Sequence, residues 1–211
     1  MRKSYRQYCP IAHALDVVGE RWSLLIVREL SHGPLRYTDL LDRLHGCGTN
    51  VLAARLRGLE QHGVVARRRL PPPAASTVYE LTAVGQGLEP VLHALCSWGL
   101  RTLGPPNADD ELVPGWLERA LGALAARLDP GLRLTVRCGG EVASIAGGAA
   151  VAGALDDAHA VVAGEPAALY ELIVHGDVAG VEIDGSVEAA VQLARAFAEP
   201  ESALAAPAAA R

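Results

Sequence analysis

The chain has 211 residues, half of them hydrophobic and a fifth charged, and its formal net charge at pH 7 is −5. This length fits one large domain or two small ones. The sequence contains no run of about 18 apolar residues that could span a bilayer. Its basic start, Met1 to Tyr8, lacks the apolar core of a secretory signal, so we expect a cytoplasmic protein with no membrane partner.

The charge is divided unevenly along the chain. Residues 1–104 hold 13 Lys and Arg against 8 Asp and Glu, a net of +5, whereas residues 105–211 hold 6 against 16, a net of −10. A basic half joined to an acidic half is typical of a nucleic-acid-binding module linked to a module that does not bind nucleic acid. We therefore expect two domains.

Apolar residues at helical spacing predict four helices in the first half: Ile11–Val18, Arg21–Leu30, Tyr37–Leu44 and Asn50–Gln61. A glycine-rich turn at 45–48 joins the last two, and Gly48 or Thr49 caps the fourth helix. A helix, a turn of about four residues and a second helix together form a helix-turn-helix motif.

The fourth helix has the two faces that a recognition helix needs. Leu52, Leu56 and Leu59 fall on one face, which seats the helix on a core. The opposite face carries small or hydrogen-bonding residues, as a helix in the major groove of DNA requires. These residues are Asn50, Ala53, Ala54 and Arg57.

A hairpin and a closing helix follow. Val64–Leu70 and Thr77–Leu81 are the strands, and the three prolines between them cannot join a sheet ladder, so the tip projects. Thr82 then caps a helix whose apolar stripe packs either on a second subunit or on its own domain, and Pro90 is expected to kink it. Residues 103–111 are a linker by composition. This order of elements is the layout of a winged helix-turn-helix.

The second half predicts a helix, three strands and two strand–glycine–helix units. The helix and strands are Pro114–Leu128, Leu132–Cys138, Glu141–Ala146 and His159–Ala163. Leu132–Cys138 alternates between apolar and polar residues, which predicts a half-buried strand. We expect an antiparallel sheet covered by helices on one face, and an Ala-rich tail after Pro200 that frays.

Between Cys9 and Leu103 the chain contains, in order, the segments CPIAHALDVVGERWSLLIVREL, GPLRYTDLLDRL, GCGTNVLAARLRGLEQHGVV, VYELTAVGQGL and SWG. This set resembles the HxlR-type winged-helix transcription regulators, which implies a DNA-binding domain at 9–103. It also implies a homodimer on palindromic operators, with the N-terminal and last helices at the interface. The chain departs from the family at the wing tip, where Ser76 and Thr77 replace a frequent Arg, and at Cys47, which replaces an Ile.

Residues 114–199 extend beyond that pattern. Their segment AVVAGEPAALYELIVHGDVAGVEIDG is similar to the sterol-carrier-protein fold, which encloses an apolar tunnel. The resemblance implies an apolar small-molecule effector, with Tyr170 or His175 as a polar group of its pocket. The alternative is a filled core that serves oligomerisation.

Candidate contacts with double-stranded DNA come from the first half. Asn50 and Arg57 are the expected base readers, and Arg55 is either a phosphate clamp or an internal salt bridge. Arg36 and Thr38 suit phosphate contacts at a helix start. The complete set is Arg36, Thr38, Thr49, Asn50, Ala53, Arg55, Arg57 and the wing residues Arg67, Arg68 and Arg69, of which Arg67 and Arg69 share one face.

The four cysteines are widely separated, and Glu171 with His175 would provide only two ligands, so we expect no metal and no cofactor. No nucleophile and base form a recognisable pair, so an enzyme is not expected. Cys9 begins the first helix, where the helix dipole favours a reactive thiolate. The family resemblance makes Cys9 a candidate redox residue, beside the alternative of an inert thiol.

We therefore interpret the chain as α+β, with an N-terminal winged helix-turn-helix followed by a small antiparallel-sheet-plus-helices domain. The expected function is transcription regulation by a homodimer on a palindromic operator, with a C-terminal domain for effector sensing or oligomerisation. The alternative is a small-molecule or lipid carrier whose winged-helix half serves only as a dimer scaffold. The three wing arginines and the net charge of +5 favour the regulator.

Overall fold

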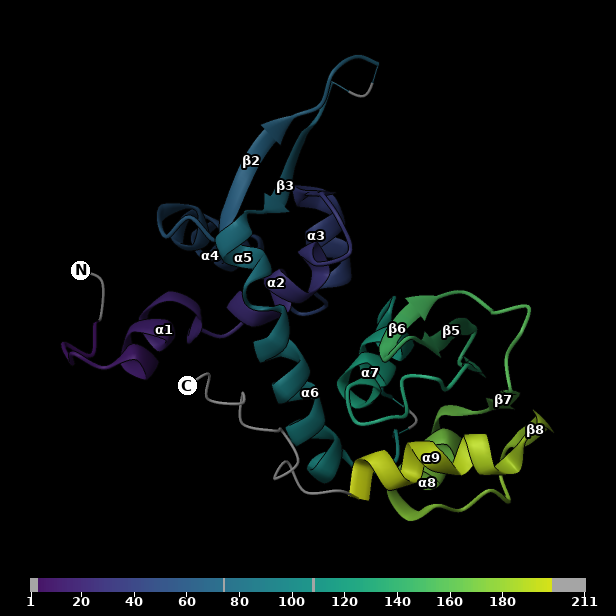
Figure 1. The fold of residues 1–211 in the computed structure, drawn as a ribbon. Coiled ribbons are helices and arrows are strands. Elements are labelled where there is room, and N and C mark those ends of the chain that lie inside the picture. Colours follow the sequence, from purple (N-terminus) through teal and green to yellow (C-terminus); the bar gives the residue numbers. More distant parts are fainter. Residues whose placement is uncertain (1–3, 74, 108, 199–211) are drawn as a thin grey trace, which may run out of the picture. The chain divides into compact units, whose positions relative to one another are not determined.

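The computed structural model describes residues 4–73, 75–107 and 109–198 (Figure 1). The chain divides into two compact units, one running to Leu92 and the other beginning at His93. The division falls inside helix α6 (Glu89–Leu103), because the second unit holds the end of that helix. There Ser97 Oγ donates a hydrogen bond of 3.1 Å to the carbonyl of Ala123. The linker predicted at 103–111 therefore lies within the second unit.

The first unit is a winged helix-turn-helix, as predicted. Its elements are α1 (Pro10–Val18), α2 (Ser23–Leu30), β1 (Leu35–Arg36), α3 (Tyr37–Arg43), α4 (Thr49–Gln61), β2 (Val65–Arg69), β3 (Thr77–Leu81), α5 (Ala83–Gln86) and the start of α6. The strands pair antiparallel in the order β1-β3-β2. Strands β2 and β3 form a hairpin that projects from the helices of this unit (Figure 1).

Helix α4 is seated on the core by the predicted leucine stripe. Leu52 is fully buried, and Leu56 and Leu59 are 1% exposed. They pack in one cluster with Ile26 of α2 and Leu40 of α3. Each fully buried Leu stabilises the fold by roughly 1.5–3 kcal/mol relative to an exposed one, so this stripe fixes which face of α4 remains outside.

Two local predictions in this unit were wrong. Helix α2 begins at Ser23 rather than Arg21, because Trp22 has a left-handed backbone with φ of 82° and cannot continue a helix. The segment after Thr82 forms two helices instead of one kinked helix. Helix α5 ends at Gln86, and α6 begins at Glu89. Pro90 lies in the first turn of α6, where its missing N–H breaks no helical hydrogen bond. The cap itself is confirmed, since Thr82 Oγ1 accepts from the Gly85 N–H at 3.2 Å.

Gly85 docks α5 against the start of the wing, and this contact makes a testable prediction. A Cβ at Gly85 would lie 2.2 Å from the carbonyl oxygen of Val64, whereas a Cβ at Gly58 in α4 would meet nothing within 4 Å. Gly85→Ala should lower the free energy of unfolding by roughly 1–3 kcal/mol. Gly58→Ala should raise it by about 0.5–1 kcal/mol, because alanine is the better helix former. Urea unfolding of both variants checks this, and equal stabilities would contradict it.

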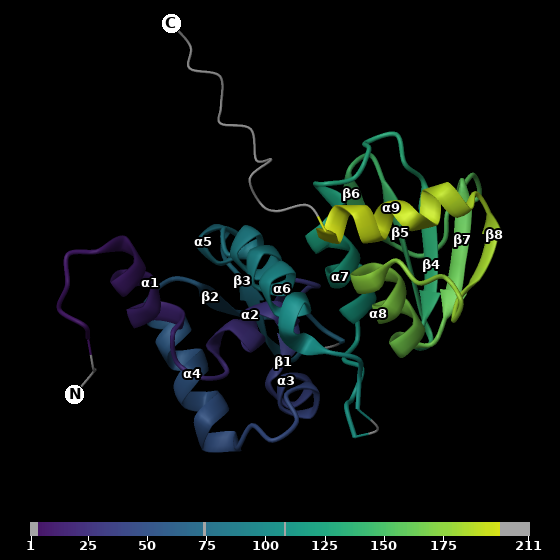
Figure 2. The ribbon, with the colours of Figure 1, turned by 90° about the horizontal axis from the view of Figure 1, so that it is seen from below.

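The second unit is a five-stranded sheet with helices on one face (Figure 2). After the end of α6 its elements are α7 (Trp116–Ala125), β4 (Leu134–Cys138), β5 (Glu141–Ala146), β6 (Ala149–Ala152), β7 (Ala160–Gly164), α8 (Pro166–His175), β8 (Glu182–Gly185) and α9 (Val187–Ala198). The strand order is β6-β5-β4-β7-β8. The sheet-plus-helices prediction is confirmed, but one pairing, between β4 and β7, is parallel rather than antiparallel.

The prediction that β4 is half-buried was wrong. Every residue of β4 except Arg137 is buried, because β4 is the central strand and the segment after β6 covers part of its outer side. The hydroxyls of Thr135 and Ser144 lie 2.9 Å apart, and the Leu155 N–H donates to Thr135 Oγ1 at 3.1 Å. These bonds satisfy polar groups that would otherwise be costly to bury.

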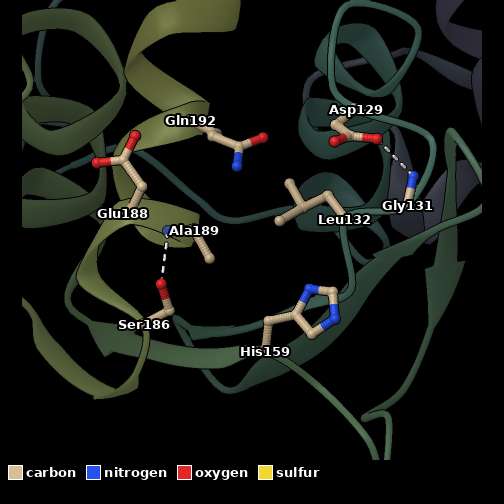
Figure 3. A pocket seen from close by; sticks show the side chains of 8 residues that line it. All are labelled: Asp129, Gly131, Leu132, His159, Ser186, Glu188, Ala189 and Gln192. Atoms are coloured by element: carbon tan, nitrogen blue, oxygen red, sulfur yellow. Dashed lines mark hydrogen bonds between the residues drawn. The ribbon is translucent and has the colours of Figure 1, made fainter.

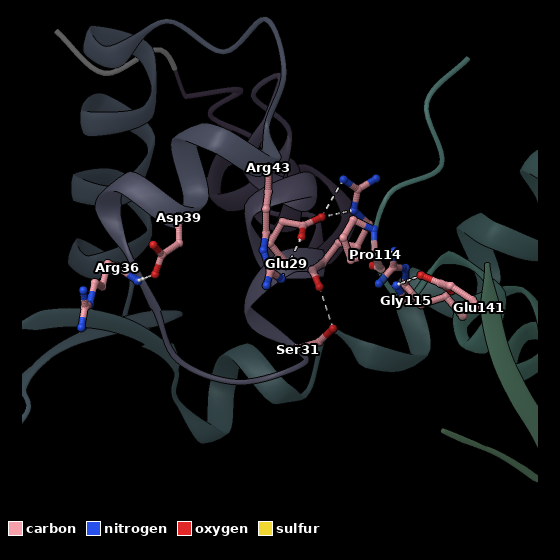
Figure 4. Close-up of polar contacts among 10 residues, drawn as sticks. Glu29, Ser31, Arg36, Asp39, Arg43, Pro114, Gly115 and Glu141 are labelled. Carbon is pink, nitrogen blue, oxygen red and sulfur yellow. Dashed lines mark hydrogen bonds and ion pairs between the residues drawn. The ribbon is translucent and has the colours of Figure 1, made fainter. Parts of the chain in front are cut away.

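Helix α7 also starts later than predicted, at Trp116 instead of Pro114, because Gly115 has a left-handed backbone with φ of 74°. The carboxylate of Glu141 on β5 caps this start by accepting from the N–H groups of Gly115, at 2.6 Å, and Leu117, at 3.1 Å (Figure 4). The predicted fraying of the tail after Pro200, and the last residue of the predicted 114–199 domain, lie outside the described residues. In the described part of the chain, no helix combines the length and the apolar character needed to cross a membrane.

Candidate DNA-binding surface

The outward face of α4 carries the residues proposed to read bases. Thr49, Asn50 and Arg57 are exposed, and Ala53 is half-buried. Gly48, in an extended conformation, is the N-cap, so α4 begins at Thr49. Among the described residues, none forms an ion pair with Arg57, whose guanidinium therefore stays available to an external partner.

Tyr37 joins the start of α3 to the start of α4. Its hydroxyl donates a hydrogen bond of 2.7 Å to the carbonyl of Thr49. Sequence reasoning gave Tyr37 no role beyond the start of the predicted helix Tyr37–Leu44 and missed this contact. The bond ties the first residue of α3 to the first residue of α4, and the two chain neighbours of Tyr37, Arg36 and Thr38, are both exposed.

The wing is connected to the same region through the sheet. In the register of the three strands, Arg36 on β1 lies opposite Val78 on β3, and Val78 lies opposite Arg68 on β2. The start of α3, the start of α4 and the wing are therefore connected, with Arg36 on the same sheet face as Arg68 and with Arg67 and Arg69 on the opposite face. We call the exposed residues of these three segments the α3–α4–wing surface.

A buried ion pair joins the end of α2 to the end of α3. The carboxylate of Glu29 on α2 is fully buried and accepts from Arg28 Nε at 2.8 Å, while Arg43 on α3 approaches its other oxygen at 3.6 Å (Figure 4). Sequence reasoning assigned no role to Glu29. The signal was a charged residue inside the apolar run LLIVREL, where burial requires a partner.

Arg55 is held inside the unit. It pairs with Glu20 at 2.9 Å, and its Nε donates to the carbonyl of Arg21 at 3.2 Å. The structure therefore shows the internal salt bridge, which was one of the two roles expected for Arg55.

The three wing arginines differ in what they contact. Arg68 Nε lies 2.9 and 3.0 Å from the two carboxylate oxygens of Glu80. This contact holds the pKa of Glu80 below its usual value and raises that of Arg68. Arg67 lies over the ring of Tyr79, 5.6 Å from its centroid. Arg69 is exposed, and within the described chain neither Arg67 nor Arg69 has an ion-pair partner.

The cysteines fall into two groups. Burial raises the pKa of the Cys47 and Cys96 thiols, and burial together with Glu165 raises that of Cys138 to about 12. Cys9 and Cys96 are half-buried, whereas Cys47 and Cys138 are buried. Cys96 donates to the carbonyl of Arg119 at 3.9 Å, and Cys9 occupies the N-cap of α1, so Cys9 is the cysteine placed best to meet a reagent from solvent.

In the second unit, the two candidate effector residues lie together on α8. The rings of Tyr170 and His175 meet edge to face, with centroids 6.1 Å apart, and His175 lies 3.8 Å from Glu171. A hollow of about 490 Å³ in this unit is lined by other residues (Figure 3). The space between sheet and helices is occupied by leucine, isoleucine and valine side chains. In the described parts of the chain, no group of three or more His, Cys, Asp or Glu is arranged to hold a metal ion.

A recognition helix with a buried face, beside a hairpin rich in arginine, defines a winged helix-turn-helix protein. Residues 17–106 match the family model described as HxlR-like helix-turn-helix. The HTH-type transcriptional regulator sll1512 of Synechocystis is 40% identical over 107 residues, which are 51% of this chain and 79% of that protein. YvaP of Bacillus subtilis, also an HTH-type transcriptional regulator, is 33% identical over 104 residues, covering 49% of this chain and 96% of YvaP.

The chain belongs to the HxlR-like helix-turn-helix family. Its relatives are transcriptional regulators, which supports a role in DNA-binding regulation and not in enzymatic catalysis. The solved structure of the reduced form of the regulator YodB from B. subtilis has 30% sequence identity and a TM-score of 0.42, and covers 48% of this chain and 100% of YodB.

Proposed function

We propose that the protein regulates transcription in the cytoplasm by binding a palindromic operator as a homodimer. The observation that supports this is the α3–α4–wing surface: Asn50 and Arg57 of α4 are exposed, and the start of α4 is bonded to the start of α3, which the sheet connects to the wing. Base readers flanked by phosphate-binding cations are what a sequence-specific DNA surface requires.

Two helices supply apolar surface for a second copy. On α1, Ile11 is 72% exposed, and on α6 Val91, Leu95 and Trp98 lie three and four residues apart and are 43%, 44% and 67% exposed. Exposed apolar side chains in a row along one helix are typical of an interaction surface. A homodimer through these helices would present two copies of α4 to DNA.

The test is operator selection from genomic fragments, followed by gel shift at several salt concentrations. We expect a two-fold symmetric site with half-sites about one helical turn apart, since two related helices must enter successive major grooves on one side of the duplex. Light scattering should show a dimer before DNA is added. Affinity that is independent of both sequence and salt would contradict the proposal, and would favour the carrier whose winged helix is only a scaffold.

The second unit is proposed to sense an effector or to support oligomerisation. Its resemblance to the sterol-carrier-protein fold, which implies an apolar effector, stays a prediction. Such a ligand would have to displace side chains of the core between sheet and helices, around Leu121, Leu134 and Leu172. Titration with a fluorescent fatty acid, with operator affinity as the second readout, tests it.

Cys9 is proposed as the thiol that oxidants reach first, because the other three cysteines are buried or held as thiols. In the native protein, one thiol of the four should react with a chromogenic disulfide reagent in a fast kinetic phase. Cys9→Ser should lack this fast phase. Mild oxidation should then change operator affinity in the wild type but not in Cys9→Ser. If neither the fast phase nor the affinity depends on Cys9, the thiol is structural.

A further inference from the structure

Arg55, in the second turn of α4, is attached to the junction between α1 and α2. One of its terminal nitrogens lies 2.9 Å from a carboxylate oxygen of Glu20, and its Nε donates a hydrogen bond of 3.2 Å to the carbonyl of Arg21. Arg21 lies 34 positions earlier in the chain. A planar guanidinium bonded at two points is oriented more firmly than one held by a single ion pair.

Arg55 points away from the face of α4 that carries the proposed base readers. An α-helix turns by about 100° per residue, so Arg55 lies roughly 160° around the axis from Arg57 and roughly 140° from Asn50. Its neighbours around the helix are Leu52 and Leu59, both of which are buried. The side chain of Arg55 is accordingly only 28% exposed. Arg55 therefore does not share the groove-facing side of the helix with the base readers.

The junction that holds Arg55 has a strained backbone. Trp22 has a left-handed conformation with φ of 82°, which a bulky residue keeps only where its surroundings enforce it. The Arg21 guanidinium lies over the Trp22 ring, 5.4 Å from its centroid, and the Ser23 N–H donates to the Glu20 carbonyl at 3.0 Å. Trp22 also packs against the apolar cluster that seats α4. Strain that is held in this way is typical of places where a protein fixes a functional geometry.

The same indole ring reaches the turn that leads into α4. A Cβ at Gly46 would lie 3.9 Å from Cη2 of Trp22, an ordinary van der Waals distance, so the turn lies beside the ring. The N-cap of α4 is Gly48, which supplies no side-chain cap. The junction therefore contacts both the turn before α4, through Trp22, and the second turn of α4, through Arg55.

We propose that Arg55 is a positioning residue for operator recognition, which acts through Glu20 and the carbonyl of Arg21 and does not bind a DNA phosphate. This role rests on the proposed function. The leucine face alone would let α4 shift or rotate slightly on the core, because apolar contacts are not directional. The hydrogen bond and ion pair of Arg55 are directional and oppose such shifts. Asn50 and Arg57 then meet base edges in the narrow range of geometry that their hydrogen bonds require.

Operator binding by Glu20→Gln tests the proposal through the direction of the change. If Arg55 positions α4, loss of its ion pair should weaken operator binding by about two- to fivefold, the equivalent of an exposed pair. Affinity for a scrambled duplex should not fall. If Arg55 were a phosphate clamp, its release and the loss of a carboxylate should instead raise the affinity for both duplexes. Tighter operator binding by Glu20→Gln would therefore overturn the proposal.

Arg55→Met provides a second measurement. It should weaken operator binding by about five- to tenfold, because both contacts are lost. The slope of log affinity against log salt concentration should stay unchanged, because no phosphate contact is lost. Glu20→Gln should cause no further loss in this background, since both changes break the same ion pair. A slope reduced by about one would reveal a phosphate contact and overturn the proposal.

The matched control is Glu60→Gln, which removes a carboxylate from α4 itself. None of the described residues forms an ion pair with Glu60, so its operator affinity should not fall below that of the wild type. Hydrogen exchange without DNA makes the result separable from that of the proposed regulator. Amides of α4 should exchange about two- to fivefold faster in Glu20→Gln than in Glu60→Gln.

Equal exchange in the two variants would overturn the proposal, because the ion pair would then not hold the helix. A wild type that shows no preference for any operator would overturn the proposed function, and with it the role of Arg55 in recognition. The exchange rates would still report whether the attachment to Glu20 holds α4, so the two failures are distinguishable.

Discussion

Replacing Leu56 by alanine is expected to lower the free energy of unfolding of the first unit by roughly 2–5 kcal/mol. Leu56 is 1% exposed and packs in the cluster that seats α4, so its removal leaves a cavity under the recognition helix. Urea titration followed by hydrogen exchange on peptides from α2 and α4 reports this unit by itself.

The matched control is Val84→Ala on α5, where the side chain is 65% exposed. This change should stay within about 0.5 kcal/mol of the wild type. A small loss in Leu56→Ala, similar to that in Val84→Ala, would show that α4 is not held by its leucine face. The assignment of its outward face would then lose its basis.

Replacing Arg57 by alanine is expected to weaken operator binding by roughly 1–3 kcal/mol and to relax the preference for bases at the contacted position. Asn50→Ala should do the same at its own position, since both side chains are exposed on the outward face of α4. Binding to a panel of operators with single base-pair changes measures both effects.

The wing arginines should respond differently. Arg69→Ala should weaken all sequences about equally and reduce the slope of log affinity against log salt concentration by about one. Arg68→Ala is the internal control, because Arg68 is already paired with Glu80 and should contribute less to either quantity. Base-specific losses in Arg69→Ala, or uniform losses in Arg57→Ala, would reverse the roles assigned here.

Elements whose pattern is local were predictable from the sequence. The leucine spacing of α4 and the proline-rich break between β2 and β3 each depend on a few consecutive residues. The caps at Gly48 and Thr82 follow from residue types with known preferences. The family motifs added the order in which these elements assemble.

Features that depend on distant partners were not predictable in this way. The left-handed backbone of Trp22 and the break between α5 and α6 leave no sign in the spacing of apolar residues. The bond from Tyr37 to Thr49 and the pairing of Arg68 with Glu80 join residues twelve positions apart. The pocket of the second unit is lined by side chains from three separate segments. The spacing of apolar residues within any one of these segments therefore does not predict the pocket.

The ion pair between Arg68 and Glu80 also has a consequence for how such a protein searches a genome. The carboxylate of Glu80 is charged at neutral pH and pairs with Arg68, which holds the pKa of Glu80 below its usual value. Each wing then offers DNA two unpaired cations instead of three, which lowers its attraction to arbitrary sequences. Genomes present about a million or more competing sites, so occupancy of an operator depends on the ratio of specific to nonspecific affinity. We therefore predict that Glu80 reduces nonspecific DNA binding, and that Glu80→Gln binds DNA more tightly but selects its operator less well.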